Sequence, residues 1–297
     1  MIGRATLKRT IKQTTGWAAI LSQPFARSSP QPRACVFYYH RVADLQFMDS
    51  HIDDWNVTPK QFERQIATLA QFAEIVSLTD LPGRLNTSSP GSKPLACLTF
   101  DDGYATFYSQ VLPILKRYEV PATAFVVTSA VGTLEPMPFD HWANRNLRRV
   151  HADSWRPFNW QELEDCVASG LVTVGSHSHR HFRGSQCTPG QMADEAGTSR
   201  EVLRSRLGEA HTAAYAYPYG NTKLGDVSLE YINAVKAAGY KLAVTTDLGL
   251  VNAGTNQFNM PRLEAHMLDS PGVLKAKAMG ALFPYRLTDH LRGAYRA

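Results

Sequence analysis

Two adjacent carboxylates, Asp101 and Asp102, follow an apolar run that predicts a buried strand. Neighbouring carboxylates repel each other, so the pair costs free energy unless a cation or a proton is shared between them. One carboxylate that binds a metal ion, beside one that stays free as a base, would be a chemical use for the pair. The alternative is a turn, because Asp102-Gly103 is among the commonest turn sequences. These residues alone do not decide between a site and a turn.

Three histidines, His177, His179 and His181, fall within five residues after a second predicted strand. Neutral imidazoles are good ligands for zinc and similar divalent metals. His177 and His181 are four residues apart, which puts them on one side of either a helix or a strand. These two are enough for a site, and His179 is then free to point elsewhere. Alone, this spacing is weak evidence for a metal site.

A third candidate is the turn Tyr217-Pro218-Tyr219-Gly220, which follows another predicted strand. Pro218 and Gly220 fix an irregular turn in which a backbone N–H can point into a cleft. Such an N–H is useful as a donor to an oxyanion. The alternative is an ordinary aromatic-rich turn.

The elements that must position these residues alternate between strands and helices. Strands are predicted at residues 35–39, 74–78, 95–100, 122–127, 171–176, 213–217, 240–245 and 261–265. Helices are predicted from the caps and apolar spacing at residues 58–72, 104–115, 160–168, 188–208 and 229–238. This alternation predicts an α/β fold with a parallel sheet and helices outside it. Seven or eight strand candidates predict a closed or nearly closed (β/α) barrel.

A parallel barrel would bring the candidate residues together. The carboxyl ends of its strands converge on one face, so we expect Asp102, His177 and His181 to meet there. One carboxylate and two histidines leave positions open for water and substrate, as in a catalytic metal site. Residues 130–158 are the least regular part of the chain, and we expect them to form an insertion near the site.

The composition is that of a folded protein with a large core. The chain has 297 residues, of which 44% are hydrophobic and 19% charged, and this excludes a disordered chain. The four cysteines have no close-paired spacing, so they predict neither a zinc knuckle nor a disulfide scaffold. The redox compartment stays open.

The net charge of +5 is unevenly placed. Residues 1–33 carry six basic side chains and no acid, which leaves the rest of the chain near neutrality. The charge is therefore no argument for nucleic-acid binding by the body. Prolines at positions 24, 30 and 32 mark a linker that ends a basic N-terminal arm.

The arm itself leaves several alternatives open. Its apolar stretch, residues 17–21, is shorter than the roughly 7–15 residues of a secretory signal core. No stretch approaches the ~20 apolar residues of a membrane span. Apolar residues among basic ones suit a helix on an anionic membrane surface. A solvated terminus is an equal alternative, and a transit peptide is a weaker one.

Taken together, the motifs resemble those of the polysaccharide deacetylases (carbohydrate esterase family four, NodB-homology domain). The order Thr99-Phe100-Asp101-Asp102-Gly103, His177-Ser178-x-x-His181, Tyr217-Pro218-Tyr219-Gly220 is similar to that family's motifs. Residues 37–42 and 121–125 also resemble family segments, so the similarity spans about residues 35–266. The resemblance implies a distorted (β/α) barrel. Residues 1–33 would then form the arm and linker, and residues 34–297 the catalytic domain that follows them.

The resemblance also implies a divalent metal, most often zinc, with cobalt, nickel or manganese as alternatives. Asp102, His177 and His181 would be the metal ligands, and Asp101 the catalytic base. Metal coordination can lower the pKa of water from about 15.7 to about 7, and Asp101 would take the proton as that water attacks an acetamide. The backbone N–H of Tyr219 would help to hold the oxyanion.

Two departures from the family pattern concern the groups around the base. Many members have an arginine where this chain has Ala216, and the acidic motif that usually partners it is absent. We expect Arg262 to replace the missing guanidinium. His266 is a candidate general acid by position, with an ordinary loop histidine as the alternative. His40 is a candidate for lining the cleft, with equal weight on a structural role.

The implied substrate is an acetylated glycan, and sugar rings bind to aromatic faces. Tyr104, Tyr217 and Pro218 are candidates for substrate binding, although Tyr104 also fits the apolar stripe of its predicted helix. We expect removal of N-acetyl groups from amino sugars of a polysaccharide. An O-acetyl esterase or a saccharide-binding pseudoenzyme is the alternative. The glycan, the oligomeric state and the compartment stay open, with attachment to a membrane or cell envelope through the arm among the alternatives.

Overall fold

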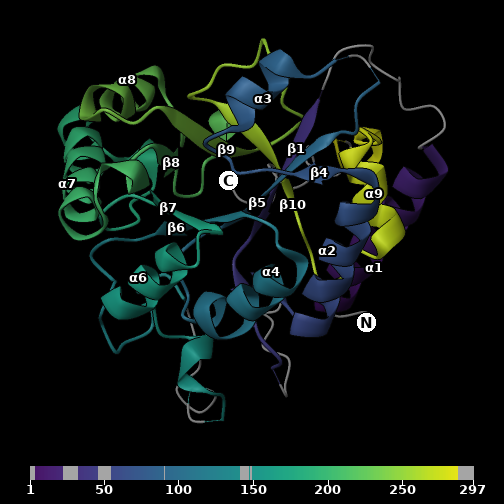
Figure 1. Ribbon diagram of the computed structural model, residues 1–297, viewed down its shortest axis with the longest axis horizontal. Coiled ribbons are helices and arrows are strands. Elements are labelled where there is room, and N and C mark those ends of the chain that lie inside the picture. The colour runs from purple at the N-terminus through teal and green to yellow at the C-terminus, as the bar shows by residue number, and fades with distance from the viewer. Residues whose placement is uncertain are drawn as a thin grey trace.

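Seven parallel strands close into a ring, with helices around the outside (Figure 1). The computed structural model describes residues 4–22, 33–45, 55–89, 91–140, 147 and 149–286. The ring strands are β1 (Ala34–Tyr39), β5 (Leu95–Phe100), β6 (Ala122–Val126), β7 (Val172–Ser176), β8 (Ala214–Ala216), β9 (Leu242–Leu248) and β10 (Met260–Glu264). The α/β barrel predicted from the alternation of elements is therefore confirmed.

The ring closes where β1 pairs with β5. Their register runs in parallel from Ala34↔Leu95 to Tyr39↔Phe100. Both strands are buried along their whole length, as expected for parallel strands covered on both faces. An eighth strand, β4 (Glu74–Ile75), pairs beside the start of β5, outside the ring, and is shorter than the predicted 74–78. A separate two-stranded sheet joins β2 (Arg41–Val42) to β3 (Asn56–Val57).

The helices that surround the ring begin and end close to the predicted positions. They are α2 (Pro59–Phe72), α4 (Leu112–Tyr118), α6 (Trp160–Ala168), α7 (Pro189–Leu207) and α8 (Leu229–Ala238). Thr58, Asn159 and Thr188 cap three of them by accepting from the backbone N–H three residues on. The predicted helix at 104–115 is different, because a π-helical turn, η3 (Phe107–Val111), precedes α4.

A helix in the arm, α1 (Arg4–Ser22), is one of the alternatives left open by the sequence, whereas α3 (Leu81–Thr87) and α9 (Pro271–Ala278) have no sequence prediction. The first lies within the predicted arm and packs against α9 (Figure 1). Ala19 is fully buried there, and Lys12 Nζ lies 3.1 Å from Glu264 Oε1. Within the described part of the arm, this helix is therefore not simply a solvated terminus. Among the residues that the structure describes, no helix has the length and hydrophobicity to cross a membrane.

Side chains on the ring strands alternate between two cores. On β1, Val36 points to the cluster that fills the ring, and Phe37 packs in the cluster between the ring and the helices. On β8 the same alternation places Ala216 inside, and Tyr215 in a third cluster under α7 and α8. This period of two decides which residues near the strand ends can reach the centre of the barrel.

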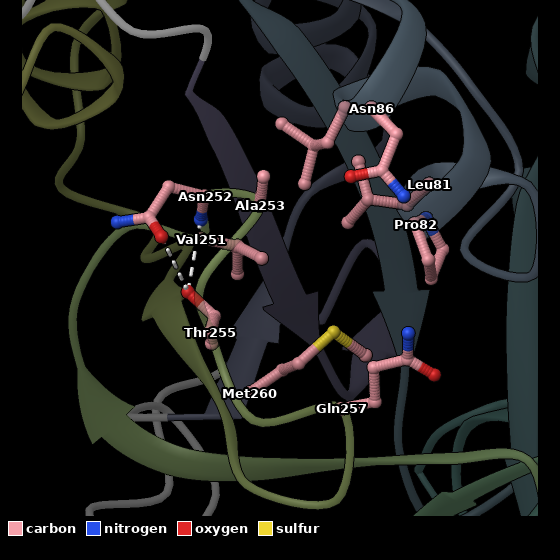
Figure 2. Close-up of a pocket in the computed structure, with 10 residues that line it drawn as sticks. Leu81, Pro82, Asn86, Val251, Asn252, Ala253, Thr255, Gln257 and Met260 are labelled. Atoms are coloured by element: carbon pink, nitrogen blue, oxygen red, sulfur yellow. Dashed lines mark hydrogen bonds between the residues drawn. The ribbon is translucent and has the colours of Figure 1, made fainter.

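A shallow pocket lies at the end of the barrel where the strands begin (Figure 2). Leu81 and Asn86 of α3 line one side, and the segment from Val251 to Met260 lines the other. Val251 pairs with Ala34, the first residue of β1. The predicted site residues follow the opposite ends of the strands, so this pocket is separate from them.

Candidate active site

Asp102, His177 and His181 meet at the carboxyl ends of β5 and β7. The distance from Asp102 Oδ1 is 3.5 Å to His177 Nε2 and 3.4 Å to His181 Nε2. All three possible ligand atoms lie within 4.8 Å of one another, and all three residues are buried. The expected convergence of these residues is therefore confirmed, although their chain positions are up to 79 residues apart.

The Asp-Gly sequence is both a turn and part of this cluster. Asp102 and Gly103 have φ values of 71° and 81°, so both residues adopt the left-handed conformation. A Cβ on Gly103 would lie 3.0–3.2 Å from Val126, including its Cα, so the position needs glycine for space as well as for φ. The two interpretations of the sequence are thus compatible, since the turn directs the Asp102 side chain toward the histidines.

The histidines follow β7, as expected, and both face Asp102, but they lie on neither a helix nor a strand, so the four-residue spacing is not what brings them to one side. They belong to a loop after β7 in which Ser178 and His181 have φ values of 65° and 63°. Ser176 Oγ accepts from Ser178 N at 3.0 Å, and Ser178 Oγ accepts from His181 N at 2.9 Å. His179 turns away, with Nδ1 3.0 Å from Thr128 Oγ1. Serine side chains therefore replace regular structure in holding the loop.

The donor atoms of the cluster suit a divalent cation. His177 Nδ1 donates to Ala216 O at 2.8 Å, so Nε2 is the ring atom that faces Asp102. Burial would raise the pKa of Asp102, but the neighbouring imidazoles of His177 and His181 hold that pKa well below its usual value, and the two aspartates in turn raise the pKa of His177 against the effect of burial. A carboxylate oxygen and two imidazole nitrogens thus converge in a buried place, which is the ligand chemistry of a catalytic zinc site.

Asp101 faces a different partner. Arg262 Nη1 donates to Asp101 Oδ1 and Nη2 to Oδ2, both at 2.7 Å, and both residues are buried. The guanidinium is itself fixed, because Nε donates to Thr245 O at 2.8 Å and Nη1 to Thr99 Oγ1 at 3.1 Å. Burial raises the pKa of Asp101, but the charges of Arg262 and His177 outweigh it and lower that pKa. The expected contact between Arg262 and the carboxylate is thus present.

Tyr219 lies beside the cluster, in a turn after β8. Its φ is 59°, and its carbonyl oxygen accepts from Thr246 Oγ1 at 2.6 Å. Its ring lies 5.1 Å from the ring of His181 and 4.1 Å below the guanidinium of Arg183. The Tyr219 N–H makes no hydrogen bond to any residue that the structure describes. This N–H is therefore available to a bound molecule, and Pro218, which is buried, helps to shape the turn.

The other two histidine candidates follow β10 and β1, the neighbours in the ring. His266 N donates to Asp269 Oδ2 at 2.9 Å, and His266 Nδ1 accepts from Leu268 N at 3.0 Å. The proton of the neutral His266 ring is therefore on Nε2. Burial lowers the pKa of His40, and the charges of Asp102 and Asp101 oppose that shift.

Two tyrosines proposed for substrate binding are core residues in this structure. Tyr217 is 0% exposed, and its hydroxyl donates to Phe258 O at 3.1 Å. It alternates with Ala216 and so points to the helices rather than to the cleft. Tyr104 is 5% exposed, lies under the guanidinium of Arg41 at 4.2 Å, and precedes the π-helical turn. It therefore belongs neither to an open groove nor to the helical stripe.

Several residues beside the cluster were missed. The ring of Phe139 stacks on His181, and the half-exposed Trp55 meets the ring of His40 at 4.6 Å. Buried Arg41 pairs with Asp140. Each of these contacts joins segments that are distant in the sequence, so no local sequence pattern predicts them. The described part of the segment 130–158 does reach the site, as expected, since Phe139 belongs to it; residues 141–146 and 148 lie outside the described residues.

Comparison with known proteins gives one family and a consistent set of relatives. The family described as polysaccharide deacetylase matches residues 88–243. The poly-beta-1,6-N-acetyl-D-glucosamine N-deacetylase of Staphylococcus aureus is 26% identical over 249 residues, covering 77% of this chain and 78% of that protein. The protein of the same name from Staphylococcus epidermidis is 24% identical over 247 residues, with the same coverage.

Solved structures give the same fold. Streptococcus pyogenes deacetylase PplD, in complex with acetate, has a TM-score of 0.67 at 21% identity and covers 84% of this chain and 99% of its own. IcaB from Ammonifex degensii has a TM-score of 0.63 at 22% identity and covers 83% of this chain and 97% of its own. At these identities the structural similarity supports the fold, and the site must be judged on its own residues.

Proposed function

The chain belongs to the polysaccharide deacetylase family, and from this premise we propose that it removes N-acetyl groups from the amino sugars of a polysaccharide by metal-dependent hydrolysis. The observation that carries the proposal is that the two adjacent aspartates, Asp101 and Asp102, contact different side chains. Asp102 lies with two histidines, and Asp101 lies against Arg262. This separates a ligand from a base, as amide hydrolysis at a metal site requires.

Asp102, His177 and His181 would hold the metal. When bound, a divalent ion supplies a Lewis acid that polarises the acetamide carbonyl and makes water more acidic. We expect zinc, with cobalt, nickel and manganese as metals to compare. Three protein ligands leave room for water and substrate in the coordination sphere.

The remaining residues would move protons and hold charge. Asp101 would accept a proton from the attacking water, because Arg262 fixes both carboxylate oxygens and keeps the group ionised. The free N–H of Tyr219 would donate to the carbonyl oxygen as negative charge develops on it. His266 is the candidate general acid: as an imidazolium it would pass its Nε2 proton to the departing sugar amine and be left as the neutral ring. His40 would contribute its ring to the wall beside the carboxylates.

The substrate proposed first is a β-1,6-linked polymer of N-acetylglucosamine. The basis is the name of the relatives that match 77% of this chain. Tyr219 and Trp55, which are 39% and 37% exposed, offer aromatic surface beside His181 and His40 respectively. Such rings can cover the apolar faces of sugar rings on either side of the reacting residue.

The test is acetate release by the purified full chain loaded with zinc or cobalt. Oligomers of β-1,6-N-acetylglucosamine, chito-oligosaccharides and O-acetylated xylan should be compared side by side. The proposal expects acetate from an N-acetylated substrate and none without metal. Release from the O-acetylated substrate alone would make the protein an esterase. Metal binding without release from any acetylated glycan would make it a saccharide-binding pseudoenzyme.

The N-terminal helix is proposed as a peripheral membrane contact. Trp17 and Leu21 lie one turn apart on α1 and are 68% and 73% exposed, in an arm of six basic residues and no acid. Such a surface suits an anionic bilayer. The full chain should bind vesicles of anionic lipid more strongly than neutral ones, and Trp17→Glu with Leu21→Glu should abolish this. Leu134→Glu, at a residue that is 77% exposed elsewhere, is the control.

A further inference from the structure

Phe139 lies flat on the ring of His181. The ring centroids are 3.8 Å apart, and the planes differ by 24°. Phe139 comes from the irregular segment between β6 and α6, so it reaches the cluster from outside the set of residues that follow the strands. Its contact is with a proposed metal ligand rather than with a substrate-facing surface.

The two histidines of the cluster are oriented by different means. The His177 ring is fixed by its hydrogen bond from Nδ1 to Ala216 O. His181 Nδ1 is buried and has no hydrogen-bond partner among the residues that the structure describes. Metal-binding histidines almost always donate their second N–H to an oxygen, which fixes the plane and tautomer of the ring. The orientation of His181 must therefore come from packing.

The packing around His181 is not symmetrical. The Phe139 ring is nearly parallel to it, whereas the rings of Tyr219 and His177 are tilted by 55° and 64° at centroid distances of 5.1 and 4.9 Å. A parallel ring at 3.8 Å blocks rotation about the bond that joins the imidazole to Cβ. The tilted rings limit where the imidazole can move but do not define its plane.

Phe139 is itself anchored. It packs against a buried cluster that includes Val127 and Met137. The next residue, Asp140, pairs with the guanidinium of Arg41, which is 1% exposed and also donates to Ser154 O. The segment that carries Phe139 is therefore tied both to β2 and to the chain before α6.

We infer that Phe139 is a positioning residue for the metal centre, whose stacking on His181 takes the place of the missing hydrogen bond and sets the metal affinity. The inference rests on the proposed metal site. The Arg41–Asp140 pair acts indirectly, by holding the segment that carries Phe139. Outer partners of metal-binding histidines typically change metal affinity about 10- to 100-fold, and we expect the lower end for a stacking contact.

The test measures zinc affinity by competition with a chromophoric chelator, and the visible absorption spectrum of the cobalt-loaded protein. Phe139→Leu keeps apolar bulk but has no flat ring, and it should weaken zinc binding about tenfold and shift the cobalt spectrum. Phe139→Tyr keeps the ring and should restore both. Phe182→Leu is the matched control, because that ring meets the guanidinium of Arg180 at 4.7 Å instead of a proposed ligand.

Two results would overturn the inference. One is a folded Phe139→Leu variant that binds zinc as tightly as the original chain, with an unchanged cobalt spectrum. The other is an equal loss in the Leu and Tyr variants, which would point to the volume of the side chain and not to stacking. Failure of the metal site itself has a different result, since the unaltered chain and His177→Ala would then bind zinc equally weakly.

Discussion

Removing the guanidinium that faces Asp101 should leave a buried negative charge without a partner. In Arg262→Met, the carboxylate keeps its position at the end of β5 but loses two hydrogen bonds of 2.7 Å from a fully buried side chain. Breaking a buried ion pair by removing one partner typically costs about 3–5 kcal/mol. We therefore expect Arg262→Met to lower the free energy of unfolding by that amount.

A double-mutant cycle separates this cost from the other contacts of Arg262. The guanidinium also donates to Thr245 O and Thr99 Oγ1, and it lies 4.7 Å from the ring of Tyr38. These contacts are lost in either background, so they cancel in the cycle. When Asp101→Asn removes the charge first, Arg262→Met should cost about 2–3 kcal/mol less, at the upper end of couplings between residues in contact.

The assay is urea unfolding of the four metal-free proteins, followed by far-UV circular dichroism. Metal must be removed, because binding to the folded state alone would add to stability. A coupling energy below about 0.5 kcal/mol would refute the reasoning, since residues without interaction add within that margin. When metal is restored, Arg262→Met should hydrolyse substrate slowly because the proposed base is misplaced, and the two variants without Asp101 should release no acetate.

Three further predictions concern the turn, the metal and the thiols. Gly103→Ala should lower the free energy of unfolding by about 1–3 kcal/mol in a urea titration, because φ is +81° and no space exists for Cβ. Gly190→Ala is the control, because a Cβ there enters open space in α7; this variant should be neutral or slightly stabilising. Zinc at 100 times its dissociation constant should stabilise the chain by about 2.7 kcal/mol in thermal unfolding, and equal stabilisation of His177→Ala would contradict the ligand assignment. Burial raises the pKa of the Cys35 and Cys166 thiols to about 12, so they should stay unmodified by a thiol reagent at pH 8 until the chain unfolds; rapid labelling of either thiol in the folded protein would be inconsistent with this burial.

The convergence of Asp102, His177 and His181 could be predicted because it depends on the topology of the strands and not on the packing of individual side chains. Each follows a strand, and in a parallel barrel all strand ends of one kind meet at one face. Local signals also placed the helices well, since α6 and α8 have the predicted bounds of residues 160–168 and 229–238, and Asn159 caps the first while Gly239 ends the second. Short-range chemistry specifies such boundaries.

The contact between Arg262 and Asp101 depends on ring closure. The two residues are 161 positions apart, and β10 reaches β5 only because β1 pairs with both. The sequence predicted the contact through the absence of an arginine at Ala216, which left the carboxylate in need of another cation. The structure supplies that cation from β10, two strands away from β5 across the closure of the ring.

Other features had no sequence signal. Ser178 and His181 adopt the left-handed conformation, but the loop that holds them contains no glycine from which this conformation could be predicted. Phe139 reaches His181 through an irregular segment, so no periodicity relates the two. Tyr217 was assigned to the cleft because of its motif, but the alternation along β8 turns it to the helices. Packing between distant segments decides all three.

The central claim is that Asp101 and Asp102 have different functions although they are adjacent. The most direct measurement compares Asp101→Asn with Asp102→Asn for bound zinc per chain and for acetate release from an N-acetylated oligosaccharide. The account predicts that Asp101→Asn keeps one zinc and releases no acetate, while Asp102→Asn loses both. Loss of zinc in Asp101→Asn, or acetate release by that variant at the original rate, would contradict it.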